Sequence, residues 1–326
     1  MNSKLIGSPK IINSAKLTDS HGRTLHKLRV QLTDACNFRC LYCMPLDAKF
    51  LPPDFLMQPE EIQEIVSNLV DFGVDELRLT GGEPTIRREF VDIVSRLNRL
   101  PVQKYGMTTN GYTLSRHLDF LKETKLKYIN VSLDSLRQER FENITRTKKF
   151  KPVMASILKA LEMGFQVKIN VVLLRGKNDD EVVDFVRFSE DTGIEVRFLE
   201  YMAIGPQYNA TSHMFISADE VMANIKNERQ LHFLPMPSDS TSYNFITEKN
   251  GNIGFIASES KPFCMQCSRL RLTATGHLRA CLMSDQGVSL RGVEKNKYAH
   301  LLNLAMGYKP TGRIESISQP MHEIGG

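Results

Sequence analysis

The sequence predicts an α/β fold in which a parallel sheet is covered by helices. Between residue 28 and about residue 200, short β-rich runs alternate with amphipathic helical patterns, as is typical of strand–helix–strand units. The chain has 326 residues, of which 41% are hydrophobic and 24% charged, and this suffices for a large globular core. Six such units fit either a doubly wound sheet or an incomplete barrel, and periodicity alone does not choose between them.

The strand candidates are β-rich runs bounded by turn residues. In chain order they are Leu28–Thr33, Glu76–Thr80, Val102–Thr108, Leu126–Leu133, Val167–Leu174 and Ile194–Glu200. After the first of them, a set of apolar residues recurs at spacings of three and four, which predicts one face of a helix. These residues are Ile62, Ile65, Val66, Leu69 and Val70.

Two capping-box patterns predict helix starts later in the chain. One pairs Asn178 with Glu181, and the other pairs Ser217 with Glu220 ahead of a helix that ends near Lys226. Beyond residue 230 the pattern gives way to prolines and small polar residues with short hairpin-like runs. We therefore divide the chain into an N-terminal leader (1–22), a strand–helix domain (23–230) and a C-terminal region (231–326).

Charge and hydropathy exclude several classes of protein. The formal net charge is +5, from 42 basic and 37 acidic residues, a surplus too small and too dispersed to indicate nucleic-acid binding. No apolar run approaches the roughly 18 residues that a membrane helix needs. The N-terminal stretch lacks the apolar core of a secretory signal. We expect a cytoplasmic protein without membrane contact that binds small anionic molecules.

The six cysteines form two groups of three, which are Cys36, Cys40 and Cys43, and Cys264, Cys267 and Cys281. In a reducing compartment such clustering indicates metal binding more than three disulfides. The first group follows a predicted strand with the spacing C-x3-C-x2-C. Three thiolates can bind three irons of a cubane and leave the fourth iron open. A structural zinc ion with a remote fourth ligand is the alternative.

The second group has the spacing C-x2-C-x13-C, and His277 lies within it. The three cysteines and His277 would suit a structural zinc ion, and a second iron–sulfur cluster with one open iron is the other interpretation. Arg269 and Arg271 stand two apart on a predicted strand, so both point to one face. They suit a triphosphate through their forked donors, although a solvated strand face is the commoner position of arginine.

Glycine and polar residues close the predicted strands at the end where α/β barrels bind ligands. Gly81 and Gly82 follow the second strand, where the missing Cβ atoms let a ligand approach the backbone; an ordinary βα turn is the alternative. Thr108 closes the third strand, and Ser132 closes the fourth. Met202 follows the sixth, although a methionine there is more often part of the core.

The first cysteine group, with Tyr42 before its last cysteine, resembles the signature of the radical S-adenosylmethionine (SAM) enzymes. This resemblance implies a partial (β/α)6 TIM-like barrel of the radical SAM type, with a C-terminal auxiliary-cluster region covering its opening. It also implies a [4Fe-4S] cluster on Cys36, Cys40 and Cys43 that binds S-adenosylmethionine at its open iron. The residues implied to contact this cofactor are Tyr42, Gly82, Ser132 and Met202.

From about Gly22 to the C-terminus, the sequence is similar to one subgroup, the GTP 3′,8-cyclases of molybdenum cofactor biosynthesis. The similarity includes the cysteine loop, the GGEP, TTNG and NVSLD segments, the second cysteine group and the terminal Gly-Gly. The GTP-binding residues that it implies are Arg29, Arg78, Thr108, Lys168, Arg269 and Arg271. The catalytic residues that it implies are Arg269, Arg271, Gly325 and Gly326, because the tail of these cyclases reaches into the active site.

The same similarity implies the reaction, its cofactors and its partners. The enzyme would be a lyase that converts GTP and S-adenosylmethionine into (8S)-3′,8-cyclo-7,8-dihydroguanosine 5′-triphosphate, using a second [4Fe-4S] cluster on Cys264, Cys267 and Cys281. Its partners would be GTP, an external one-electron reductant and a downstream cyclic pyranopterin monophosphate synthase; a homodimer is left open. The alternatives are a radical SAM enzyme acting on a peptide or another substrate, a diverged paralogue, and a zinc-stapled binding protein.

Overall fold

The computed structural model describes residues 16–206 and 208–325, and their strands form a single twelve-stranded sheet. Its centre consists of six parallel strands, which are β1 Lys27–Gln31, β2 Glu76–Thr80, β3 Lys104–Thr109, β4 Leu126–Ser132, β5 Gln166–Val172 and β6 Glu195–Leu199. The six predicted strands are confirmed, with ends that differ by two residues at most.

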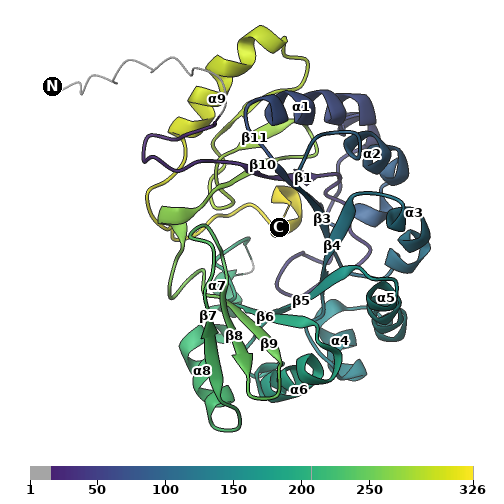
Figure 1. Ribbon diagram of the computed structural model, residues 1–326, viewed down its shortest axis with the longest axis vertical. Coiled ribbons are helices and arrows are strands. Elements are labelled where there is room, and N and C mark those ends of the chain that lie inside the picture. Colours follow the sequence, from purple (N-terminus) through teal and green to yellow (C-terminus); the bar gives the residue numbers. More distant parts are fainter. Residues whose placement is uncertain (1–15, 207, 326) are drawn as a thin grey trace, which may run out of the picture.

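The order of the strands identifies the fold as a partial barrel. Strands β1 to β6 pair in sequence order without the reversal that a doubly wound sheet has. The edge strands β12 and β7 do not pair with each other, so the barrel stays open on one side. Figure 1 shows the curved sheet with helices on its outer side and the C-terminus in its hollow. This arrangement confirms the predicted partial TIM-like barrel.

Alternation along the strands separates the apolar core from a polar interior. On β1, Leu28 and Val30 are buried in the hydrophobic core, whereas Lys27 and Arg29 face the inside of the barrel. The helices that connect the strands are α1 Pro59–Asp71, α2 Phe90–Leu97, α3 Leu118–Lys122, α4 Gln138–Thr145, α5 Phe150–Glu162 and α6 Val182–Thr192. Their apolar faces pack on the outward side chains of the sheet. The inside of the barrel is therefore left to polar side chains.

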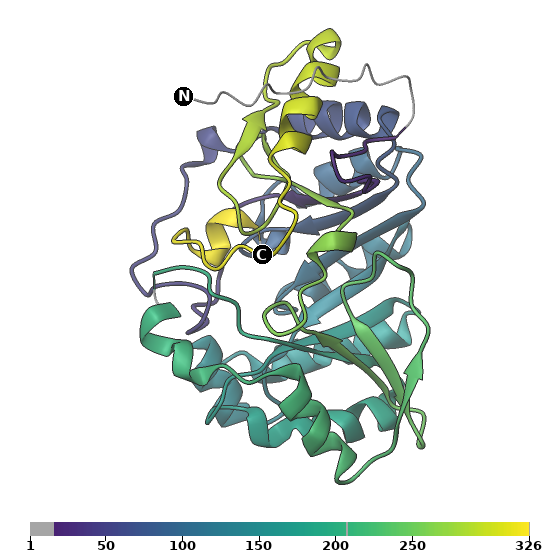
Figure 2. The ribbon, with the colours of Figure 1, turned by 90° about the vertical axis from the view of Figure 1, so that its left-hand side faces the viewer.

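The C-terminal region extends both edges of the central sheet. After β6 come the helices α7 Tyr208–Thr211 and α8 Ala218–Lys226, and then the strands β7 Leu231–Leu234, β8 Tyr243–Thr247 and β9 Asn252–Ile256, of which β9 pairs with β6. At the other edge lie β10 Arg269–Leu272, which pairs with β1, then β11 His277–Arg279 and β12 Gly287–Ser289. The last helices are α9 Tyr298–Gly307 and α10 Met321–Ile324. Viewed from the open side, the C-terminal segment crosses the barrel (Figure 2).

One of the two predicted capping boxes is confirmed, and the other is wrong. The Ser217 side chain caps α8 and Glu220 bonds back to it. Asn178 instead uses its side chain to join neighbouring loops, accepting from Leu174 N and donating to the carbonyl oxygen of Asp134. A short 3₁₀ turn follows Asn178, and α6 begins only after it.

Most of the predicted leader lies outside the described residues. Residues 1–15 of the predicted leader lie outside the described residues, whereas Leu17 is fully buried and Thr18 forms a β-bridge with Thr24. All helices of the described part are too short or too polar to cross a bilayer.

Candidate active site

A cavity of about 570 Å³ occupies the inside of the barrel. Its lining includes all six cysteines and nearly all the other predicted site residues, which are Arg29, Tyr42, Arg78, Gly82, Thr108, Ser132, Lys168, Met202, Arg269 and Arg271. The volume lies in the range typical of small-molecule sites. The two cysteine groups, far apart in the sequence, thus face one cavity.

The first cysteine loop follows the carboxyl end of β1 and is held by its own backbone and by an aromatic anchor. Phe38 donates its N–H to the Cys36 sulfur at 3.4 Å, and its ring is buried in contact with Tyr112 and Phe141. Asn110, from the TTNG segment after β3, donates to the same sulfur at 3.7 Å. The loop therefore presents its thiols to the cavity from a fixed base.

The thiols of this loop suit a metal cluster better than a single ion. Burial raises the pKa of Cys36 to about 11 and that of Cys43 to about 12, so bound metal is needed to keep them as thiolates. All six thiols are free. Within residues 16–206 and 208–325, no three His, Cys, Asp or Glu side chains lie close enough to share a single metal ion. A cubane places each thiolate on a different iron and so accepts a wider spacing.

The GGEP turn packs directly against the start of the cysteine loop. A Cβ atom on Gly82 would lie 2.3 Å from the carbonyl oxygen of Ala35 and 2.5 Å from that of Asp34. The next residue, Glu83, is fully buried and accepts from Thr109 Oγ1 at 2.7 Å and from Asn110 N at 2.6 Å. The turn therefore joins the carboxyl ends of β1, β2 and β3 in one network, and glycine is required for the close approach of backbones.

Replacing Gly82 with alanine is expected to lower the free energy of unfolding by about 1–3 kcal/mol, because two carbonyl oxygens must move. The displaced cysteine loop should also bind less iron on anaerobic reconstitution. Gly307→Ala is the matched control, since a Cβ atom there meets nothing within 4 Å. Thermal unfolding and iron analysis of both variants measure the effect, and equal values for Gly82→Ala and the wild type would contradict it.

The predicted S-adenosylmethionine residues lie around the cysteine loop. The Tyr42 hydroxyl donates to Asp134 Oδ2 at 2.7 Å, and Val172 N donates to the other oxygen at 2.9 Å. Burial raises the pKa of Asp134 to about 6. Ser132 and Met202 face the same end of the cavity from the carboxyl ends of β4 and β6. The structure thus brings together the residues that were predicted from separate strands.

Three arginines stand side by side on adjacent strands and face the cavity. Arg271 on β10 is in register with Arg29 on β1, which is in register with Arg78 on β2. Register neighbours in a sheet lie about 4.8 Å apart, so these like charges repel each other. Burial and the neighbouring arginines lower the pKa of Arg29 well below its ordinary value and that of Arg271 to about 9.

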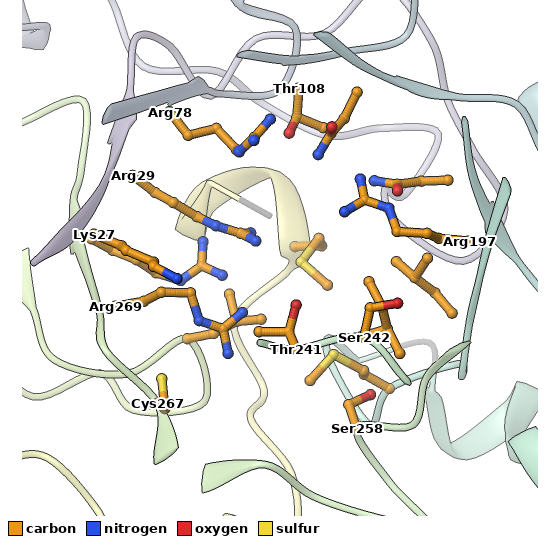
Figure 3. Close-up of a pocket in the computed structure, with 18 of the residues that line it drawn as sticks. Lys27, Arg29, Arg78, Thr108, Arg197, Thr241, Ser242, Ser258, Cys267 and Arg269 are labelled. Carbon is orange, nitrogen blue, oxygen red and sulfur yellow. The ribbon is translucent and has the colours of Figure 1, made fainter. Parts of the chain in front are cut away.

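The carboxylates that line this cavity pair with other cations of the described residues: Glu76 and Asp239 pair with Lys27, and Glu195 pairs with Lys168. No acidic side chain there forms a salt bridge with Arg29, Arg78, Arg269 or Arg271. Figure 3 shows Arg29, Arg78 and Arg269 pointing into the cavity, with Thr108 and Arg197 on its other sides. Guanidinium groups that line a cavity without a carboxylate partner are suited to a polyanionic ligand.

The second cysteine group lies at the opposite end of the barrel from the first. Cys267 precedes β10, which runs parallel to β1, whereas Cys36 follows β1. Five residues of strand separate the two ends, which corresponds to about 16 Å. Burial raises the pKa of Cys267, but the charges of Arg269 and Lys309 outweigh it and lower this pKa to about 6. His277 lines a different cavity from the three cysteines, which argues against the alternative zinc site.

Lys309, which no local sequence pattern singles out, holds this second group in place. Its buried ammonium group donates to Cys267 Sγ at 3.5 Å and to the carbonyl oxygens of Arg269 and Ala280 at 2.8 Å each. Arg23 adds a contact from the N-terminal side, donating to the carbonyl oxygen of Cys264 at 2.7 Å. The loop therefore depends on cations from both ends of the chain.

Replacing Lys309 with methionine should destabilise the loop by about 1–3 kcal/mol for each buried carbonyl that loses its donor. The change should appear as a lower melting temperature and faster hydrogen exchange in β10. Lys295→Met is the control, because that side chain is 69% exposed. Unchanged exchange in β10 of Lys309→Met would show that the lysine does not hold the loop.

The C-terminal tail enters the barrel beside the arginines. The carbonyl oxygen of Gly325 accepts from Arg271 Nη1 at 2.6 Å, and Gln31 Nε2 donates to the carbonyl oxygen of His322 at 2.8 Å. Gly325 has φ +69°, and a Cβ atom there would lie 3.0 Å from Gln31 Cβ, so glycine fits best. Gly326, also predicted to be catalytic, lies outside the described residues.

Further polar residues of the cavity were missed. Arg197 on β6 and Asn170 on β5 are register neighbours that line the cavity, and each has a buried polar atom without a hydrogen-bond partner. Such unsatisfied groups inside a cavity indicate where a ligand binds. The signal that could have found them is the polar alternation Lys168, Asn170 and Glu195, Arg197 along two strands that are otherwise apolar.

Comparison with protein families agrees with this architecture. The radical SAM superfamily matches residues 30–189, and the family Molybdenum Cofactor Synthesis C matches residues 194–311. SuiB of Streptococcus suis, solved with its precursor peptide SuiA, shares the fold with a TM-score of 0.65 at 13% identity, over 88% of this chain and 68% of that one. The protein is thus a radical SAM enzyme, a class that uses S-adenosylmethionine and iron–sulfur chemistry.

Comparison with curated relatives shows which family of radical SAM enzymes the chain belongs to. The chain is 42% identical to the GTP 3′,8-cyclase of Synechocystis over 96% of each chain, and 41% identical to that of Aquifex aeolicus over 86% of this chain and 90% of that one. It is 43% identical to mouse molybdenum cofactor biosynthesis protein 1 over 91% of this chain and 48% of the relative. The chain belongs to the GTP 3′,8-cyclase family. This membership removes the zinc-stapled binding protein from the alternatives.

Proposed function

We propose that the protein converts GTP and S-adenosylmethionine into (8S)-3′,8-cyclo-7,8-dihydroguanosine 5′-triphosphate, the first step of molybdenum cofactor biosynthesis. The observation that carries this proposal is the row of Arg271, Arg29 and Arg78, which stand in register between two three-cysteine groups and form no salt bridge with a carboxylate of the described residues. A triphosphate provides the charge that this row lacks. The family to which the chain belongs supports the same substrate.

The arginines and their neighbours bind and orient GTP in this proposal. Arg29, Arg78, Arg269 and Arg271 hold the triphosphate through charge-assisted hydrogen bonds. Lys168 lines the cavity and pairs with Glu195 at 2.5 Å. When GTP binds, the ammonium group of Lys168 leaves this carboxylate and contacts the substrate instead. Thr108 offers a hydroxyl beside Arg78. Because these groups lie on five strands of a rigid sheet, the nucleotide is held in one orientation.

Cys36, Cys40 and Cys43 would hold one [4Fe-4S] cluster, and Tyr42, Gly82, Ser132 and Met202 would orient S-adenosylmethionine beside it. When bound, this pair supplies the one-electron chemistry that removes a hydrogen atom from C3′ of GTP, so that C3′ can join C8. Cys264, Cys267 and Cys281 would hold a second [4Fe-4S] cluster that binds the guanine end. Their donor set fits, since three sulfur atoms face the cavity and Lys309 stabilises a thiolate at Cys267.

The tail and the barrel walls exclude water from the radical chemistry. The carbonyl oxygen of Gly325 accepts from Arg271, so the tail reaches the arginine row, where a residue without a side chain can pass close to the substrate. We propose that Arg269, Arg271, Gly325 and Gly326 act together at this point. We further propose that the enzyme is cytoplasmic, receives electrons from an external one-electron reductant and passes its product to a cyclic pyranopterin monophosphate synthase.

Anaerobic reconstitution tests the proposal. Reconstituted enzyme given S-adenosylmethionine and a reductant should form 5′-deoxyadenosine faster when GTP is added, and a cyclised nucleotide should accumulate. Peptides should have no such effect, because the cavity charge suits a polyphosphate. Stimulation by a peptide and none by GTP would favour the other class of radical SAM substrate and contradict the proposal.

A further inference from the structure

A loop of residues 235–242, between β7 and β8, reaches across the open side of the barrel to the starts of β1 and β10. Its Asp239 Oδ2 accepts from Ser268 Oγ at 2.6 Å, from Lys27 Nζ at 2.7 Å and from His26 Nε2 at 2.9 Å. Ser268 precedes β10, and His26 and Lys27 lie at the start of β1. One carboxylate thus connects the β7–β8 hairpin to β1 and β10, the two strands that carry Arg29 and Arg271.

The three hydrogen bonds to Asp239 are charge-assisted and hold the 235–242 loop firmly. The side chain of Asp239 is 21% exposed and its three donors hold the pKa of this carboxyl far below its ordinary value, although burial alone would raise it. His26 is itself fixed, because its Nδ1 atom bonds Asp75 Oδ1 at 2.7 Å. Charge-assisted bonds to a common acceptor are about twice as strong as neutral ones. Asp239 is therefore bonded to side chains that are themselves held in place, such as His26.

The loop is also stiff and forms a wall of the cavity. Ser240 Oγ donates to the carbonyl oxygen of Ser242 at 3.0 Å, and Ser242 Oγ donates to Asn244 Oδ1 at 2.6 Å. Gly254 on β9 leaves room for this wall, since a Cβ atom there would lie 2.4 Å from Ser242 Oγ. In Figure 3, Thr241 and Ser242 border the cavity on the side opposite Arg78 and Thr108.

We propose that Asp239 is a positioning residue that fastens the 235–242 loop across the open side of the barrel, so that Thr241 and Ser242 face the bound nucleotide and water is kept out. The inference rests on the proposed function for the identity of the nucleotide. Because Ser268 directly follows Cys267, the same carboxylate couples the wall to the second cysteine group. Asp239 does not touch the reacting atoms in this account; it acts through the loop.

The first test needs no turnover. Hydrogen exchange of the anaerobically reconstituted enzyme is measured for residues 235–242 in the wild type, in Asp239→Asn and in Lys27→Met. We expect exchange about tenfold to a hundredfold faster in Asp239→Asn, as the loss of charged hydrogen bonds predicts, and a smaller increase in Lys27→Met. Asp191→Asn, an exposed aspartate of α6, is the matched control. Wild-type exchange in Asp239→Asn would overturn the proposal.

The second test separates positioning from folding. In Asp239→Asn the amount of 5′-deoxyadenosine formed per cyclised nucleotide should rise and the KM for GTP should increase, while the melting temperature stays near that of Asp191→Asn. An unchanged ratio and KM, together with a loosened loop, would show that the wall does not serve the substrate. If no variant, including the wild type, responds to GTP, the proposed function fails, and the exchange experiment still decides whether Asp239 fastens the loop.

Discussion

Replacing Cys40 with alanine is expected to reduce formation of 5′-deoxyadenosine below detection, with or without GTP. The thiol lies in the first cysteine loop, where burial raises its pKa well above the ordinary value. Without this thiol, the proposed cluster would keep only Cys36 and Cys43 as ligands from this loop, because the other three cysteines belong to the second group at the opposite end of the barrel. Anaerobic reconstitution followed by chromatography of the nucleosides measures the effect.

Cys281→Ala serves as the matched control, since it removes a cysteine from the other end of the cavity. That variant should still cleave S-adenosylmethionine slowly but form no cyclised nucleotide. Iron analysis should give about eight irons for the wild type and about four for either variant, as two cubanes require. Equal behaviour of the two variants toward S-adenosylmethionine would contradict the separate roles of the two groups.

Replacing Arg29 with alanine should weaken GTP binding while leaving the ligand-free enzyme at least as stable as the wild type. Arg29 stands between Arg78 and Arg271 in register, so its removal relieves repulsion before GTP binds and removes a phosphate contact afterwards. The loss of a hydrogen bond to a charged group, about 1.5–3 kcal/mol, corresponds to about a tenfold to a hundredfold weaker Kd. Calorimetry with GTP and thermal unfolding without it measure the two effects.

The opposite signs of these effects distinguish a binding residue from a structural one. Arg99→Ala, an exposed arginine after α2, is the control and should change neither value. A large fall in the melting temperature of ligand-free Arg29→Ala, with GTP affinity unchanged, would mean that the row supports the fold and not the substrate.

Much of this arrangement could be predicted from the sequence. Local alternation predicts all six central strands, and the spacing of Cys36, Cys40 and Cys43 indicates a metal cluster. Arg269 and Arg271 were placed on one strand face because the side-chain period of a strand is two residues. These features depend on residues that are near one another in the chain.

The features that were missed depend on contacts between distant segments. Pairing of β10 with β1 puts Arg271 beside Arg29, and no local pattern encodes that register. From the sequence alone, Lys309 would be assigned to the surface, whereas in the fold it donates to the backbone of β10. Asp239 lies in a polar loop without periodicity, so no local pattern indicates its contact with Ser268. The sequence predicts Asn178 as a helix cap because its neighbours fit a capping box, yet its side chain donates to the carbonyl oxygen of Asp134, 44 residues earlier in the chain. Long-range pairing decided each of these positions.

The most direct test of the account uses GTP that carries deuterium at C3′. If the cavity holds the triphosphate on its arginine row with the ribose toward the first cysteine group, the 5′-deoxyadenosine formed by the reconstituted enzyme should contain deuterium. Recovery of 5′-deoxyadenosine without deuterium, alongside normal consumption of S-adenosylmethionine, would contradict the account, because the hydrogen atom would then come from a source other than C3′ of the bound nucleotide.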